Sequence, residues 1–253
     1  LVATPLALAA VWLGNPWFAL LVALVVLLAC REFYRMALGA RDRGLGRLGT
    51  GLALGLALTP LYLPGRPFLL IAAATLPLAW LALSAPRRDI PRRWVWTLAG
   101  ALYTGWLLGH LVGLRDLGDS GREWVLLALL VTFSSDTAAF FGGRALGRHP
   151  MAPAISPGKT WEGGVAGLLG GIAAGLLLNY LLALPLSPGQ AVLLGALVSI
   201  AGQLGDLAES MLKRRAGVKD SGGLLPGHGG ILDRMDSVVF TGPVVYYLVV
   251  WLG

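Results

Sequence analysis

Long apolar runs separated by short polar loops set the pattern of this chain. Most runs cover about 18 to 22 residues, the length that crosses the hydrocarbon core of a bilayer as an α-helix. None alternates apolar and polar residues, and within lipid a backbone satisfies its hydrogen bonds only in helices or closed barrels. The pattern therefore predicts an all-α, polytopic integral membrane protein with about nine transmembrane helices. The expected spans are residues 1–13, 16–36, 48–64, 67–84, 94–114, 123–143, 161–183, 189–212 and 235–252.

The composition supports this fold class. Of the 253 residues, 56% are hydrophobic and only 13% are charged, whereas about 25% of the residues in a soluble domain are charged. The first span is short and the chain lacks an initiator methionine, so we expect a trimmed N-terminus; no secretory signal peptide is visible. Pro60, Pro64 and Pro67 punctuate the third and fourth spans.

The basic residues fall on alternate loops of this arrangement. Of the 20 lysines and arginines, 17 lie in the loops after the second, fourth, sixth and eighth spans; the others are Arg66, Arg115 and Arg122. Cytoplasmic loops are enriched in Lys and Arg, so we expect the N-terminus in the cytosol and the C-terminus outside. The net charge of +7 then reflects topology rather than nucleic acid binding, for which the sequence carries no recognition motif.

Most acidic residues that lie in or beside the spans belong to the C-terminal half. We therefore expect residues 1–120 to be scaffold helices and residues 121–253 to be a catalytic region whose polar site faces the cytosol. The single Cys30 excludes an internal disulfide, and we expect it to be a small buried side chain. The acids of the C-terminal half that bear on the site are Asp136, Glu162, Asp206, Glu209, Asp220, Asp233 and Asp236.

A stripe of glycines runs along the expected span 161–183. Gly163, Gly167, Gly171 and Gly175 recur every four residues and so share one helix face. Small residues let the backbones of neighbouring membrane helices approach closely. The stripe predicts a helix-packing surface rather than a ligand site.

The segment 210–237 is the longest polar run between apolar spans. It holds five cationic side chains, three aspartates, one histidine and six glycines. Basic groups bind phosphate oxygens, glycines allow close approach of backbone N–H groups, and acids hold a cation. Just before and within it, Asp206, Glu209, Ser210 and Lys213 follow helical spacing and should share a face. The combination predicts a site for a metal-bound phosphate compound, the alternative being an internal acid–lysine pair.

Three aspartates are the candidate metal ligands besides Asp206. Asp233 and Asp236 lie one helical turn apart, and Asp136 lies in an apolar span beside two serines and a threonine. Two or three carboxylates are the usual protein share of a Mg²⁺ site. For Asp233 the alternative is a helix-capping role, and for Asp136 a structural polar cluster whose partner is a metal, Lys159 or a neighbouring helix.

A second basic loop precedes the glycine-striped span. Ser156, Lys159 and Thr160 stand where the positive end of a helix would meet an anion. The spacing of a P-loop is absent, and the alternative is a positively charged loop with a helix cap. His228 lies between glycines, which suggests either a phosphate contact or a loop residue without a role.

At these residues the chain resembles the phosphatidate cytidylyltransferases, also called CDP-diacylglycerol synthases. Two shorter segments of that family are matched by Ser156, Pro157, Lys159, Thr160, Glu162 and Gly163, and by Gly205, Asp206, Leu207, Glu209 and Ser210. The family signature is matched by Ser210, Lys213, Arg214, Lys219, Asp220, Pro226, His228, Gly229, Gly230, Asp233, Arg234 and Asp236.

The resemblance implies transfer of CMP from CTP to phosphatidic acid, giving CDP-diacylglycerol and pyrophosphate in phospholipid biosynthesis. It implies Mg²⁺ dependence, allows a monovalent cation such as K⁺, and suggests a homodimer in the inner (cytoplasmic) membrane with no nucleic acid partner. Asp206, Asp233, Asp236 and Asp136 would bind metal. The catalytic set would be Asp206, Asp233, Asp236, Lys213 and Lys219. The substrate-binding set would be Ser156, Lys159, Thr160, Ser210, Arg214, Asp220, His228, Gly229 and Gly230.

Other function classes stay open at this point. A transporter would use intramembrane acids to couple cations, but broken helices and repeated halves are not evident. A polyprenol kinase or an archaeal-type lipid cytidylyltransferase would also use CTP at a membrane. A CDP-alcohol phosphotransferase is disfavoured because its acidic motif is missing.

Overall fold

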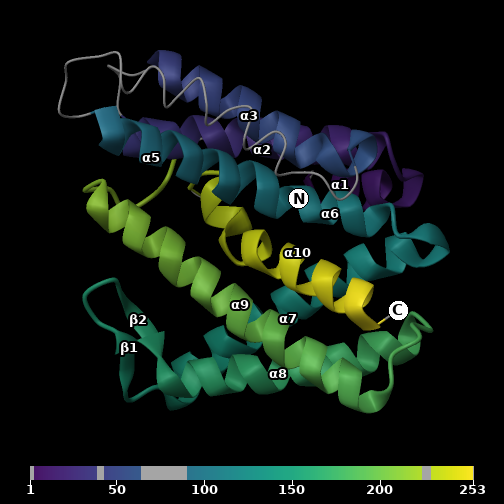
Figure 1. Cartoon of the computed structure of the whole chain (residues 1–253). Helices are drawn as coiled ribbons and strands as arrows, with labels where there is room; N and C mark the ends of the chain where they lie inside the picture. Colours follow the sequence, from purple (N-terminus) through teal and green to yellow (C-terminus); the bar gives the residue numbers. More distant parts are fainter. Residues whose placement is uncertain (1–2, 39–42, 64–89, 224–228, 253) are drawn as a thin grey trace. The chain divides into compact units, whose positions relative to one another are not determined.

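The computed structural model describes residues 3–38, 43–63, 90–223 and 229–252, and most of them are helical (Figure 1). Within these ranges, six helical segments are long and apolar enough to cross a membrane. They confirm six of the expected spans and an all-α polytopic membrane protein. The segments are Trp17–Ala37, Arg93–Arg115, Gly118–Leu146, Trp161–Leu181, Pro188–Arg215 and Leu232–Leu252.

Three expected spans have other outcomes. The first corresponds to helix α1 (Ala3–Leu13), which at 11 residues is too short to cross a bilayer. The third corresponds to α3 (Arg43–Tyr62), which is a helix but is not among the six candidate spans. Its first turns carry Arg43 and Arg47, and its glycines lower its hydropathy. The span expected at 67–84 lies outside the described residues. The number nine therefore stays a prediction.

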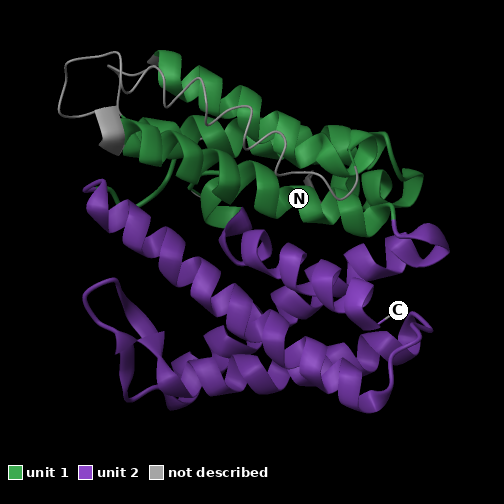
Figure 2. Ribbon diagram, in the orientation of Figure 1, with its two compact units in different colours: residues 1–116, 218–234 green, residues 117–217, 235–253 purple. Residues whose placement is uncertain are grey.

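The chain divides into two compact units, which Figure 2 colours separately. Unit 1 comprises residues 1–116 and 218–234, and unit 2 comprises residues 117–217 and 235–253. The segment 218–234, which carries much of the polar run, is thus a part of unit 1 although it lies late in the sequence. Each unit is described by itself.

Unit 1 is a helical bundle held by small residues. It contains α1, α2 (Trp17–Ala37), α3, α5 (Ile90–Gly100), the π-helical turn η2 (Ala101–Trp106) and α6 (Leu107–Arg115). A Cβ atom on Gly105 would meet the Ala53 backbone oxygen at 2.3 Å, so η2 and α3 touch backbone to backbone. Cys30 is buried, as expected, and its Sγ lies 2.9 Å from the Thr104 hydroxyl.

Unit 2 contains α7 (Gly121–Leu146), the hairpin strands β1 (Pro150–Ala152) and β2 (Ser156–Thr160), α8 (Trp161–Leu181), α9 (Pro188–Arg215) and most of α10 (Leu232–Leu252); the 3₁₀ turn η3 (Gly118–Ser120) precedes α7. All four glycines of the α8 stripe are buried. A Cβ on Gly167 would press on Ala139 of α7, and one on Gly175 would press on Ala191 of α9. The stripe is therefore the packing surface that its spacing predicts.

A close helix crossing in unit 2 yields a stability prediction. A Cβ on Gly195 would lie 2.5 Å from the Gly171 oxygen and 2.8 Å from the Ile172 Cα. Because both are backbone atoms, the helices must separate, and we expect Gly195→Ala to destabilise the protein by about 1–3 kcal/mol. The measurement is the apparent melting temperature of the detergent-solubilised protein. Gly189→Ala, on the same helix with open space around it, is the control; equal melting temperatures for the two variants would contradict the crossing.

The loop between α7 and α8 forms an antiparallel hairpin of β1 and β2. Its sequence gives no alternating pattern because the strands are short and none of their residues is buried. The hairpin lies outside the candidate spans, so it does not alter the fold class. It delivers Lys159 and Thr160 to the start of α8.

Candidate functional site

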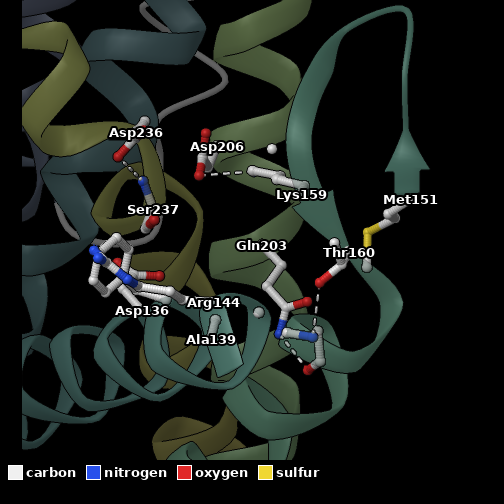
Figure 3. Close-up of a pocket in the computed structure, with 15 residues that line it drawn as sticks. Asp136, Ala139, Arg144, Met151, Lys159, Thr160, Gln203, Asp206, Asp236 and Ser237 are labelled. Carbon is white, nitrogen blue, oxygen red and sulfur yellow. Dashed lines mark hydrogen bonds and ion pairs between the residues drawn. The ribbon is translucent and has the colours of Figure 1, made fainter. Parts of the chain in front are cut away.

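The cavity that brings together five of the predicted site residues lies within unit 2 and has a volume of about 610 Å³. Residues of α7, β2, α8, α9 and α10 line it (Figure 3). Three of the predicted metal ligands, Asp136, Asp206 and Asp236, and two of the predicted substrate ligands, Lys159 and Thr160, share this cavity. The structure therefore brings together groups that are up to about a hundred residues apart in sequence.

Asp206 is held from two sides at the cavity wall. The Lys159 Nζ lies 2.7 Å from Asp206 Oδ2, and the Ser210 hydroxyl donates to Asp206 Oδ1 at 3.4 Å. Figure 3 shows Lys159 reaching from the hairpin toward the carboxylate. Both side chains are partly exposed and line the cavity, while the Lys159 Nζ atom itself is buried. An incoming anion would compete with Asp206 for the ammonium group.

Asp136 and Asp236 face Ser237, one from each of two helices (Figure 3). The Ser237 side chain is hydrogen-bonded to Asp136, and the Ser237 backbone N–H donates to Asp236 Oδ1 at 2.7 Å. Both carboxylates are close enough to Asp206 for repulsion between like charges. Three mutually repelling acids beside one lysine favour the binding of a cation.

The local structure explains how the hairpin is placed. Glu162 in the first turn of α8 accepts hydrogen bonds from the backbone N–H groups of Arg148 and His149, and it pairs with the His149 ring at 2.6 Å. Arg214 Nε donates to the Ile155 oxygen at 3.2 Å. The Thr160 hydroxyl caps α8 by accepting from the Gly163 N–H. Arg214 and Thr160, both predicted substrate ligands, thus also shape the site.

Gln203 and Arg144 are among the polar residues that line the cavity and were not predicted. Gln203 lies one turn before Asp206 on α9 and donates to the Gly164 oxygen at 3.1 Å. Arg144, near the end of α7, lines the cavity, whereas its place in a basic loop had suggested a role in topology alone. A polar residue at helical spacing from an intramembrane acid was the available signal for Gln203.

The predicted polar face of α9 is confirmed. Besides the Ser210–Asp206 bond, Lys213 forms an ion pair with Glu209 one turn earlier, and Glu209 is fully buried. Glu209 and Lys213 thus form the internal acid–lysine pair that the sequence left open as the alternative to a metal site. Lys213 also lies near enough to Asp236 to attract it electrostatically. Ser156 belongs to β2 and is only partly exposed.

The remaining predicted ligands belong to unit 1. Asp233 Oδ2 accepts hydrogen bonds from the Ser221 N–H, the Ser221 hydroxyl and the Gly230 N–H at 2.8 to 3.0 Å. Gly229 adopts a φ of +77°, and a Cβ there would lie 2.7 Å from Asp233 Oδ2. The glycines therefore approach this carboxylate closely. The metal role of Asp233 stays a prediction; Lys219 and Asp220 are exposed, and His228 lies outside the described residues.

Glu32 on α2 is the functional candidate that sequence reasoning missed. It is 7% exposed, and its carboxylate accepts from the backbone N–H groups of Ile231 and Leu232 at 3.1 and 2.9 Å. The Ser221 hydroxyl, 3.0 Å away, shares its one hydrogen between Glu32 and Asp233. A Cβ on Gly230 would lie 2.3 Å from Glu32 Oε2. An N-terminal helix thus holds the signature segment. The only sequence signal was an acid between two arginines near the end of an apolar span.

We expect Glu32→Gln to loosen this segment. An amide has one acceptor oxygen in place of two and adds N–H donors that face other donors. The free energy of unfolding should therefore fall by about 1–3 kcal/mol. Limited proteolysis of residues 216–231 should accelerate, and the melting temperature should fall. Asp116→Asn, an exposed acid of the same unit, should change neither. Equal protease resistance of Glu32→Gln and the unmodified protein would contradict the contact.

The cavity of unit 2 fits Mg²⁺ in donor chemistry. Its carboxylates and the Ser237 hydroxyl are the hard oxygen ligands that this ion prefers. Within residues 3–38, 43–63, 90–223 and 229–252, no three His, Cys, Asp or Glu side chains form a preassembled metal cluster. This arrangement suits an ion that keeps waters and binds through one or two carboxylates together with substrate phosphates.

These features define a class: a polytopic helical membrane protein with a cavity of carboxylates and cationic side chains suited to a metal-bound phosphate compound. The chain belongs to the Cytidylyltransferase family, whose family model matches residues 1–252. It is 46% identical to the phosphatidate cytidylyltransferase of Brucella suis over 60% of this chain and 56% of that protein. Over 94% of this chain and 67% of the relative, it is 38% identical to phosphatidate cytidylyltransferase 5, chloroplastic, of Arabidopsis thaliana.

A further relative is the phosphatidate cytidylyltransferase of Bacillus subtilis, 41% identical over 60% of this chain and 56% of that protein. The matches to the two bacterial proteins therefore span a little over half of their length. Membership of the family disfavours the transporter and the kinase, because both belong to other function classes.

Proposed function

We propose that this protein transfers CMP from CTP to phosphatidic acid, giving CDP-diacylglycerol and pyrophosphate. The observation that carries the proposal is the cavity in which Asp136, Asp206 and Asp236 from three helices meet Lys159 from the hairpin. Its relatives are named phosphatidate cytidylyltransferases. A phosphorylated lipid and a nucleotide are two anions, and a site that accepts both must neutralise charge.

The reaction forms one bond and breaks one. A phosphate oxygen of phosphatidic acid attacks the α-phosphorus of CTP, and the bond between the α-phosphorus and the bridging oxygen breaks as pyrophosphate leaves with that oxygen. A phosphate monoester is already an anionic nucleophile, so the chain needs to position and neutralise rather than to abstract a proton. Lys159, Arg144 and Thr160 line the cavity; the two cationic groups would bind phosphate oxygens, and the threonine would donate a hydrogen bond.

Mg²⁺ is the cofactor that we propose for this reaction, bound by Asp206 and Asp236 with Asp136 as a further candidate. When bound, it would polarise phosphate oxygens and offset the negative charge that gathers in the transition state. Asp233, Lys213, Lys219, Ser156, Ser210, Arg214, Asp220, His228, Gly229 and Gly230 stay proposed site residues. A monovalent cation such as K⁺ is a further proposal.

We also propose the finer topology. Nine spans with a cytosolic N-terminus would place both basic motifs on the cytosolic side, where CTP is found, in the inner membrane of a bacterium. A homodimer is proposed from the family resemblance. Residues 1–120 are proposed as scaffold and residues 121–253 as the catalytic region, although residues 218–234 of the signature belong with Glu32 to unit 1.

The test is turnover of purified protein in detergent with radiolabelled CTP and phosphatidic acid. We expect label on the α-phosphate of CTP to enter a lipid as CDP-diacylglycerol, with release of pyrophosphate, in Mg²⁺ and not in a chelator. Replacing phosphatidic acid with a polyprenol should give no labelled lipid even when the label is on the γ-phosphate, which a kinase would transfer. Phosphorylated polyprenol, or no product with either lipid, would contradict the proposal.

A further inference from the structure

The exposed face of α2 ends beside a small cavity of unit 1. The cavity has a volume of about 260 Å³ and is lined by Leu28, Arg31, Glu32, Arg35, Gly222 and Gly223. Arg31 and Arg35 are one helical turn apart and both exposed. Two guanidinium groups at this spacing form a fork that suits a phosphate group. Nothing in the proposed reaction uses this cavity.

An apolar stripe leads along the same face of α2 to the two arginines. Leu20, Leu24 and Leu27 are 58%, 52% and 45% exposed, and with Arg31 and Arg35 they follow helical spacing on one side. α2 is itself a candidate membrane span. The face is therefore apolar along the part of the helix expected in lipid and cationic at one end. A phospholipid matches both parts, because its acyl chains are apolar and its phosphate is anionic.

The acid in the cavity does not cancel this positive charge. Glu32 is buried and turned to the signature segment, where it accepts hydrogen bonds. Arg35 Nη2 donates to the Ser221 oxygen at 2.9 Å, which fixes one guanidinium at the cavity wall. Gly222 and Gly223 form the opposite wall. Because glycine has no side chain, neither residue fills the cavity.

We propose that this cavity binds the phosphate of an anionic phospholipid, whose acyl chains lie along Leu20, Leu24 and Leu27. A free phosphate ion would gain the arginine contacts but not the apolar contact, which contributes roughly 25 cal/mol per Å² of buried surface. The site is separate in its residues from the cavity of unit 2. A lipid bound there also contacts the glycines of the signature segment, which Glu32 and Arg35 hold.

The test is native mass spectrometry of the full chain in detergent with phosphatidylglycerol and with phosphatidylcholine of the same acyl composition. Phosphatidylglycerol carries the phosphate charge but not the monoester that the proposed reaction consumes, so its binding reports on this site independently of turnover. We expect the protein to retain phosphatidylglycerol and not phosphatidylcholine. Equal retention of both lipids would overturn the proposal.

Matched variants locate the site. Arg31→Gln with Arg35→Gln should lower the retention of phosphatidylglycerol by about tenfold or more, because charge-assisted hydrogen bonds are lost. Arg47→Gln with Arg148→Gln removes two exposed arginines that line neither cavity, and retention should stay within about twofold. Equal losses in the two double variants would show diffuse attraction and overturn the site.

Two further arms keep the test decisive. If the double variant fails to fold, Arg31→Gln alone leaves the Arg35–Ser221 bond in place and should still lower retention by about threefold or more; unchanged retention would overturn the proposal. Inorganic phosphate at millimolar concentration should displace little of the lipid. Complete displacement by inorganic phosphate would show a site for free anions rather than for lipid.

Discussion

Replacing Asp206 with asparagine is expected to lower kcat for CDP-diacylglycerol formation by about 10²–10³-fold, the usual loss for a charged group that acts on the transition state. Asp206 meets the Lys159 ammonium at 2.7 Å and shares its cavity with Asp136 and Asp236. The amide keeps the shape of the side chain but loses the charge that attracts a cation. The measurement is turnover of radiolabelled CTP with phosphatidic acid at saturating concentrations of both.

The matched control is Asp119→Asn, an exposed acid in the turn before α7. It makes the same chemical change in the same unit, and its kcat should stay within about twofold of the unmodified protein, as is usual for surface sites. Both variants should elute from size-exclusion chromatography as the unmodified protein does. Comparable losses of turnover in the two variants would show that Asp206 has no special place in the reaction.

Replacing Lys159 with glutamine should lower kcat/KM for CTP by about 10²-fold, with a higher KM, because a cation for the phosphates is removed from a partly buried site. The structure adds a second expectation. Lys159 and Asp206 are paired, so Lys159→Gln combined with Asp206→Asn should cost much less than the product of the two single losses. Steady-state kinetics of all four proteins measure this coupling.

The control for the lysine is Arg148→Gln, which removes an exposed cation at the base of the same hairpin loop. Its KM for CTP should be nearly unchanged. Fully multiplicative losses in the Lys159 and Asp206 double variant would contradict the pairing, and an unchanged KM in Lys159→Gln would contradict its proposed role in binding the nucleotide.

The fold was predictable where one segment carries its own signal. The apolar run at 161–183 predicts α8 almost to the residue, and the glycine spacing predicts its buried face. α9 extends past its predicted end at residue 212 to Arg215, because cationic side chains are favourable at a helix C-terminus. A short, exposed hairpin between α7 and α8 gives no such signal, since neither strand has a buried face.

The site was predictable in part, for a related reason. Asp136, Lys159, Asp206 and Asp236 were each noticed as polar groups beside apolar helices, and the structure places all of them at one cavity. Glu32 was not predicted, because its partners Ser221 and Leu232 are 189 and 200 residues away in sequence. Only the folded chain shows that such distant residues meet.

A structure of the protein with CTP and Mn²⁺, whose anomalous scattering locates the metal, decides whether the cavity of unit 2 is the reaction site. We expect manganese at the carboxylates of Asp206 and Asp236, with the triphosphate beside Lys159 in this cavity. Manganese and nucleotide bound elsewhere, with this cavity still holding the Lys159–Asp206 pair unaltered, would contradict it.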